Sequence, residues 1–301
     1  MYKITEIVAV ELNYIELESP DGQSKAQICI NQGGRLSDFV FKNIQILADS
    51  NSTPYKDTFA SSILFPFANR IKDGEYTFNN LKYKLQCNEI DKNNALHGFV
   101  YNKPFEVIDS LVTQEFASLT LLYKDDGKTE GFPFKFNIEL TYKLYKNGII
   151  LSIKVVNNDK SSFPFNIGWH PYFYSKNFDN SALNFKSATK YVYDAQQIIS
   201  GTTELDVEMP FQLKDVKLDT GYLLTTNEIK FSTPEYNLNI ISNSKDFFLQ
   251  LYTPDDQNII AIEPMTGAAD NFNNEIGLQT LQSNETYDVK WCVSIETLKL
   301  K

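Results

Sequence analysis

Strict alternation of apolar and polar residues over 136–144 is the feature that most limits the folds open to this chain. A second apolar-rich run, 149–156, follows after Asn147-Gly148. A period of two places successive side chains on opposite faces of a strand. Asn-Gly between two such runs is typical of a tight β-turn. The sequence therefore predicts an antiparallel hairpin that turns at Asn147-Gly148.

The same pattern recurs along the chain. Residues 74–78 and 81–85 alternate on either side of Asn79-Asn80, and Asn tolerates positive φ, so a second hairpin is predicted there. Further strand-like runs cover 27–30, 118–123, 229–232, 238–241, 247–252, 259–263 and 287–295. No long segment keeps a helical period, and only short helices are expected, near 57–62. This pattern predicts an all-β fold of stacked antiparallel sheets.

Length and cysteine content set the domain organisation. A chain of 301 residues can bury a large core without a disulfide or metal. Its three cysteines are far apart and show no CxxC spacing, which argues against a disulfide framework or a zinc site. No linker or shift in composition divides the chain. One domain over residues 1–301 is the simplest interpretation.

Charge and hydropathy limit the classes of partner that the protein can bind and the compartments in which it is expected. The formal net charge of −10 argues against nucleic-acid binding, which needs basic patches to neutralise phosphates. No run of about 18 apolar residues could span a membrane, and the N-terminus does not resemble a signal peptide. A cytoplasmic protein is expected, and the sequence gives no indication of its oligomeric state.

The chain has only two histidines, His97 in Leu-His-Gly and His170 in Trp-His-Pro. Both segments look like turns or strand ends, where binding and catalytic residues are common. Imidazole exchanges protons near neutral pH, so the two are candidates for acid–base chemistry. The alternative is a pair of hydrogen-bonded structural histidines. Metal binding has little support, because no HxxxH-type spacing occurs.

Three charged residues add to this set. Glu263 ends an apolar run directly before Pro264, and partial burial there would raise its pKa and suit a general base. The alternative is a strand-end glutamate in solvent. Arg70 follows an aromatic run and could face a cleft, or it could pair at the surface with Asp73 or Glu75. Asp219, in Leu-Asp-Thr-Gly, could simply form a turn.

These segments together resemble the aldose 1-epimerase (galactose mutarotase) family. The most specific match runs from Asn69-Arg70-Ile71, through the hairpin that follows it, to Leu96-His97-Gly98. The segments around His170, Gln250 and Glu263 resemble further family motifs. The resemblance implies a single-domain β-supersandwich, a small sugar as the substrate, and no metal or organic cofactor.

The resemblance also implies a role for each residue. Glu263 would take a proton from the C1 hydroxyl of a pyranose while His170, helped by His97, protonates the ring oxygen. The ring would open and close again as the other anomer, as in mutarotation of free glucose or galactose. Four residues would hold the sugar: Asn69, Arg70, Asp219 and Gln250.

Two departures from the typical family pattern bear on the substrate. Phe65-Pro66-Phe67 stands where typical galactose mutarotases have Gly-Arg, and Gly168-Trp169 precedes His170. Both features are similar to a divergent branch that includes hexose-6-phosphate mutarotases. A phosphosugar enzyme would need extra Arg or Lys at the pocket. A hexose-6-phosphate mutarotase and a non-catalytic sugar-binding protein therefore remain alternatives.

Overall fold

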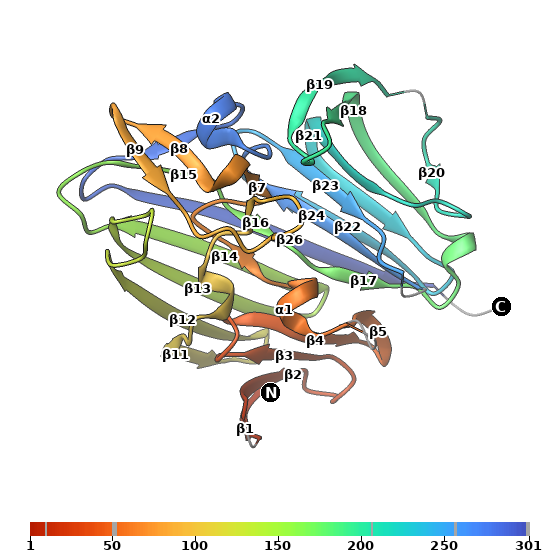
Figure 1. The fold of residues 1–301 in the computed structure, drawn as a ribbon. Coiled ribbons are helices and arrows are strands. Elements are labelled where there is room, and N and C mark those ends of the chain that lie inside the picture. Colours follow the sequence, from red (N-terminus) through yellow and green to blue (C-terminus); the bar gives the residue numbers. More distant parts are fainter. Residues whose placement is uncertain (10, 50–52, 206, 256–257, 299–301) are drawn as a thin grey trace.

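The computed structural model describes all residues except 10, 50–52, 206, 256–257 and 299–301, so the last three residues of the predicted domain lie outside this description. Long antiparallel strands form two layers (Figure 1). The first layer contains, in order of pairing, β11 (Glu106–Val112), β12 (Phe116–Asp126), β13 (Lys135–Tyr145), β14 (Gly148–Asn157), β26 (Thr286–Thr297), β22 (Tyr236–Ser242), β21 (Asp219–Ser232), β18 (Ala182–Tyr193) and β19 (Ile199–Glu204).

The second layer carries the residues of interest. It contains, in order of pairing, β1 (Lys3–Val8), β2 (Asn13–Glu18), β3 (Lys25–Cys29), β4 (Arg35–Phe41), β5 (Ile44–Leu47), β17 (Tyr172–Tyr174), β24 (Ile259–Met265) and β23 (Phe248–Tyr252). Three short strands pair with these layers: β6 (Ile63–Leu64), β16 (Gly168–Trp169) and β20 (Phe211–Gln212). Six others form separate two-stranded sheets, which are β7 (Arg70–Ile71) with β10 (Ala95–Leu96), β8 (Glu75–Phe78) with β9 (Leu81–Lys84), and β15 (Phe163–Phe165) with β25 (Gln279–Leu281).

Helices are few and short. They are α1 (Tyr55–Thr58), α2 (Asn271–Asn274) and the 3-10 turns Lys72–Gly74, Val100–Asn102 and Phe178–Asn180. The β8–β9 hairpin and α2 lie together at one end of the molecule (Figure 1), where the Tyr76 and Phe272 rings meet edge to face. Across the described segments, no helix is long and apolar enough to cross a membrane.

Strand β21 joins the two layers. Its first half, Asp219 to Leu223, pairs with β23, and its second half, Glu228 to Ser232, pairs with β22. The core lies between the layers and is lined by alternate residues of the long strands, as the period of two predicts. Trp169 of the second layer stacks on Trp291 of the first, with ring centroids 6.3 Å apart.

The hairpin turn at 147–148 is displaced by one residue from its predicted place. Tyr145 pairs with Gly148, so the two-residue loop is Lys146-Asn147 and Gly148 begins β14. Gly148 has φ 147°, and a Cβ there would lie 2.1 Å from the carbonyl oxygen of Val293. The glycine serves the close approach of β26 rather than the turn. The Asn79-Asn80 hairpin forms as predicted, with both residues at positive φ.

Two other predictions were wrong in extent. The helix predicted near 57–62 is α1, which ends at Thr58 because Phe59 adopts a left-handed conformation with φ 52°. Glu263 does not end its strand, because β24 continues through Pro264. The N–H groups of Ile262 and Thr266 donate toward the β16–β17 side. Gly168 pairs with Met265 and Tyr172 with Ala261, so the same register places Pro264 opposite Trp169 at the end of β16, where its missing N–H removes one ladder bond.

Candidate active site

A row of residues across β24 and β23 of the second layer and the first half of β21 forms the floor of the candidate site. Glu263 on β24 lies opposite Gln250 on β23, which lies opposite Gly221 on β21. Residues directly opposite one another share a face, as do residues two apart on one strand. Asp219 therefore points to the same face as Gly221, and its Oδ1 accepts a hydrogen bond from Gln250 Nε2 at 2.7 Å. Residues distant in sequence thus converge on one face.

His170 completes this row from the break between β16 and β17. Backbone hydrogen bonds fix it on both sides, because its N–H donates to Ser62 and its carbonyl accepts from Ser61. Its ring stacks on Tyr172 with centroids 5.2 Å apart. His170 Nε2 lies 3.4 Å from Glu263 Oε1, and the two side chains are only 6% and 2% exposed. An imidazole and a carboxyl are therefore adjacent in a nearly dry environment.

His97 reaches the same place from the loop after β10. It adopts φ 63°, and its N–H donates to the Asn69 carbonyl. The Asn69 N–H in turn donates to His97 Nδ1 at 3.2 Å. The ring meets His170 edge to face with centroids 5.1 Å apart. Nitrogen or oxygen atoms of His97, His170 and Glu263 all lie within 4.8 Å of one another.

Burial sets the charge of this cluster. It lowers the pKa of His170 to about 4 and lowers the pKa of His97 as well, where the neighbouring His170 and Arg70 add to the effect. Burial raises the pKa of Glu263 well above its usual range, the Asp219 charge raises it further, and the Arg70 charge opposes both. Burial therefore favours neutral imidazoles and the protonated form of Glu263.

Two imidazoles and one carboxylate form a set of groups that can hold zinc or non-haem iron. Because His97 Nδ1 accepts the Asn69 N–H, the neutral ring must carry its proton on Nε2. Metal-ligating histidines show the reverse, with the ring N–H that does not face the metal donating to an acceptor. His97 is therefore arranged to donate a hydrogen bond into the site, and the set fits acid–base chemistry better than a metal.

Arg70 lies beside this cluster on β7. Its Nε and Nη2 donate to both carboxylate oxygens of Glu89 at 2.8 to 3.1 Å, and its Nη1 donates to Asn69 Oδ1 at 3.3 Å. The side chain is 11% exposed. The acidic partner is thus Glu89 rather than Asp73 or Glu75.

Two residues of this region escaped the sequence analysis. Glu89 lies in a polar turn with no motif to mark it, and Tyr193 is one of 17 tyrosines. The Tyr193 hydroxyl donates to Gln250 Oε1 at 3.2 Å. A Cβ on Gly221 would lie 2.5 Å from that hydroxyl oxygen, so the glycine makes room for the tyrosine. Only the absence of a side chain at Gly221 could have hinted at this contact.

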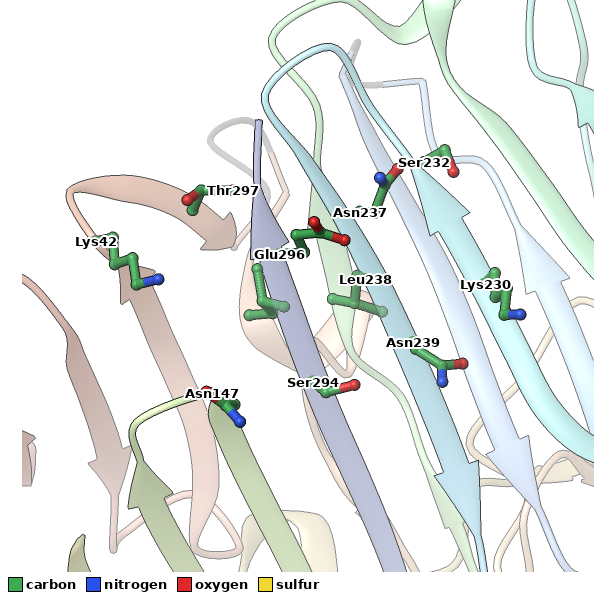
Figure 2. Close-up of a pocket in the computed structure, with 11 residues that line it drawn as sticks. Lys42, Asn147, Lys230, Ser232, Asn237, Leu238, Asn239, Ser294, Glu296 and Thr297 are labelled. Atoms are coloured by element: carbon green, nitrogen blue, oxygen red, sulfur yellow. The ribbon is translucent and has the colours of Figure 1, made fainter. Parts of the chain in front are cut away.

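A separate hollow of about 700 Å³ lies over β22 and β26. Figure 2 shows Lys42 and Asn147 on one side of β26, and Asn239 on β22 and Lys230 on β21 on the other. No histidine is among its described lining residues, and Glu296 is its one carboxylate. It therefore lacks the paired groups that proton transfer needs.

The hydrogen bond from Asn69 makes a spectroscopic prediction. His97 is expected to be neutral, with its proton on Nε2, from pH 5 to 8. Nitrogen-15 NMR of histidine-labelled protein would show one protonated and one bare ring nitrogen for this residue. With two histidines in the chain, the His170→Asn variant assigns the signals. A His97 signal that titrates near 6.5, or a proton on Nδ1, would contradict the arrangement.

Burial of Glu263 predicts a gain in stability when its charge is removed. A folded-state pKa above the unfolded value of about 4.5 means that stability is lost as pH rises above 4.5. Glu263→Gln removes this loss, so the variant is expected to be more stable than the parent at pH 7.5, by roughly 1 to 3 kcal/mol. The gain should vanish below pH 4.5. Urea unfolding at both pH values measures it, and an equal difference at both would refute it.

Comparisons with known proteins place this chain in a family. The family model described as aldose 1-epimerase matches residues 15–293. An uncharacterised protein of Escherichia coli K12, YihR, is 23% identical over 271 residues, covering 86% of each chain. A second one from that organism, YphB, is 21% identical, covering 82% of this chain and 87% of its own.

Solved structures agree on the fold. A galactose mutarotase-like protein from Clostridium acetobutylicum superposes with a TM-score of 0.88 at 20% identity, covering 99% of each chain. A galactose 1-epimerase from Lactobacillus acidophilus superposes with a TM-score of 0.78 at 18% identity, again over 99% of each. The all-β, galactose mutarotase-like fold predicted from the sequence is confirmed. With the family model matching most of its length, the chain belongs to the aldose 1-epimerase family, as a divergent member.

Proposed function

We propose that this protein is a mutarotase that interconverts the α and β anomers of a free aldohexose such as glucose or galactose. The observation that carries the proposal is the buried contact of 3.4 Å between His170 Nε2 and Glu263 Oε1. Anomer exchange requires one acid and one base on either side of a hemiacetal, with no redox group. The cluster offers both functions within reach of one sugar ring.

The shared proton explains how both functions arise together. In the resting pair the proton sits on Glu263 and His170 is neutral. Transfer of that proton across 3.4 Å produces a carboxylate base and an imidazolium acid in one step. Arg70 favours this form, since its charge lowers the pKa of Glu263. Hydroxyl groups of a bound sugar would also stabilise the ion pair by hydrogen bonds.

Ring opening then follows with a balanced movement of protons. The Glu263 carboxylate takes the proton of the C1 hydroxyl, and His170 gives its proton to the ring oxygen as the C1–O bond breaks. The product is the open-chain aldehyde. Rotation about the C1–C2 bond presents the other face of the carbonyl. The reverse transfers close the ring as the other anomer and regenerate the carboxylate–imidazolium pair. The proton then returns from His170 to Glu263, which restores the resting pair.

Binding roles are proposed for the polar groups around the pair. His97 donates from Nε2 toward the ring oxygen or a neighbouring hydroxyl. Asp219 and Gln250, already joined by a hydrogen bond of 2.7 Å, present acceptor and donor atoms to sugar hydroxyls. Asn69 and Arg70 donate from the opposite side. A sugar-binding protein without turnover would need the same hydroxyl contacts but not the buried acid–base pair.

Removal of either proton carrier should abolish catalysis. Glu263→Gln and His170→Asn are each expected to lower kcat by about 100-fold or more, the usual contribution of one acid–base group. Polarimetry of freshly dissolved α-glucose and α-galactose measures the rate above the spontaneous one. Lys230→Gln, in the separate hollow, is the control and should retain the parent rate. Unchanged rates in both site variants would refute the roles. A parent protein that binds sugar without accelerating the exchange would favour the non-catalytic alternative.

The low pKa of His170 predicts an unusual acid limb in the pH profile. The active form holds one proton between Glu263 and His170, so activity falls only when a second proton binds. With a His170 pKa of about 4, kcat/KM should stay high down to about pH 4. An unperturbed histidine would bring the loss near pH 6.5. The pair titrates as a unit, so the profile reports both groups together. An acid limb near 6.5 would contradict the proposed burial effect.

A further inference from the structure

Arg70 is the one arginine placed beside the proposed proton carriers in the described structure, and its hydrogen-bonding capacity is partly used. A guanidinium binds carboxylate or phosphate most strongly through two parallel N–H bonds from one edge. In this protein the Nε–Nη2 edge is already occupied by both oxygens of Glu89. One donor of Nη1 points to Asn69 Oδ1. Single donors remain for a further ligand.

Glu89 is itself held by several partners. Its backbone N–H and carbonyl form a reciprocal pair with those of Asn94 at 3.1 and 3.2 Å. The Asn94 amide donates to Glu89 Oε2 at 2.9 Å and to the Gln196 carbonyl at 2.8 Å. Asn94 is fully buried, and the Glu89 side chain is 10% exposed. The carboxylate is therefore fixed before any sugar arrives.

The charges around Arg70 offset one another. Glu89 and Asp219 carry negative charge toward the guanidinium, and both favour its charged form. Lys92 contacts Glu89 at 3.3 Å from the outer, more exposed side. No excess of positive charge faces the Glu263 cluster. An anionic sugar substituent would therefore meet a guanidinium whose Nε–Nη2 edge is filled and whose charge is already balanced.

We propose that Glu89 is a positioning and specificity-determining residue, which orients Arg70 for single hydrogen bonds to sugar hydroxyls and excludes anionic sugars from this side of the pocket. This inference rests on the proposed function and deepens it, because it selects the uncharged aldose over the hexose 6-phosphate. Glu89 acts through Arg70 and needs no contact with the sugar. Its loss would leave Arg70 with a free bidentate edge and an unbalanced charge.

Glu89→Gln tests the charge directly, because it keeps the shape and removes the negative charge. The variant should bind inorganic phosphate at least about tenfold more tightly than the parent, since a hydrogen bond to a charged group contributes about 1.5 to 3 kcal/mol. Calorimetric titration with phosphate measures this without any assay of turnover. Glu75→Gln is the matched control, since Glu75 is exposed and pairs only with Lys84. Adding Arg70→Gln to Glu89→Gln should abolish the gained phosphate binding.

Glu89→Asp tests positioning, because it keeps the charge but shortens the reach. It should show no gain in phosphate binding, and it should raise KM for free aldoses while changing kcat by less than about threefold. Glu89→Gln should lower the ratio of kcat/KM for glucose to kcat/KM for glucose 6-phosphate. Phosphate binding by Glu89→Gln no tighter than by Glu75→Gln would overturn the proposal. If Glu89→Gln does not fold, a parent-like KM in Glu89→Asp would overturn it instead.

Failure of this inference can be told apart from failure of the proposed function. A parent protein that accelerates no anomer exchange would refute mutarotation, whereas phosphate titration of the variants would still report on Glu89. A parent that equilibrates glucose 6-phosphate faster than glucose would refute the exclusion of anions and leave mutarotation standing.

Discussion

The proximity of a carboxyl and an imidazole in a nearly dry environment is the constraint on which the rest of this structure depends. Glu263 and His170 are each almost fully buried, and burial disfavours the ionised form of both. Burial of unpaired charge is expensive, so the pair stays neutral at rest. Oε2 of Glu263 and Nδ1 of His170 have no hydrogen-bond partner among the described residues. Such unsatisfied buried atoms lower stability.

The backbone around the site contains several residues in energetically unfavourable conformations. Asn69 and His97 both adopt left-handed conformations, as do Phe59 and Ser61 in the segment that packs against His170. Non-glycine residues in this region each cost of order 1 kcal/mol or more and persist only when their surroundings fix them. The reciprocal hydrogen bonds between Asn69 and His97, and those from Ser61 and to Ser62, provide that fixation. The site residues are thus held by main-chain bonds rather than by side-chain packing alone.

The sequence was sufficient to predict the fold class and which residue types meet at the site, but not the contacts that they make there. Alternation over 136–144 predicted β13 because a period of two depends only on local burial. The convergence of His97 with Glu263 came from a family resemblance, since no local pattern links residues so far apart. Glu89 could not have been found, because its role depends on a tertiary ion pair with Arg70. The turn at Asn147-Gly148 was predicted one residue too late, because Gly148 is needed for the close approach of β26, a strand distant in the sequence.

Two carboxylates on one face of the sheet show how environment divides their roles. Asp219 lies at the start of β21, where it is exposed, and Glu263 lies in the middle of β24, where it is buried. The charge on Asp219 makes ionisation of Glu263 harder, whereas Arg70 makes it easier. Glu89 holds Arg70 in place, so it also sets how strongly Arg70 acts on Glu263. The readiness of Glu263 to release its proton is therefore a property of four charged groups on four separate segments, fixed in position by the antiparallel pairing of the strands beneath them.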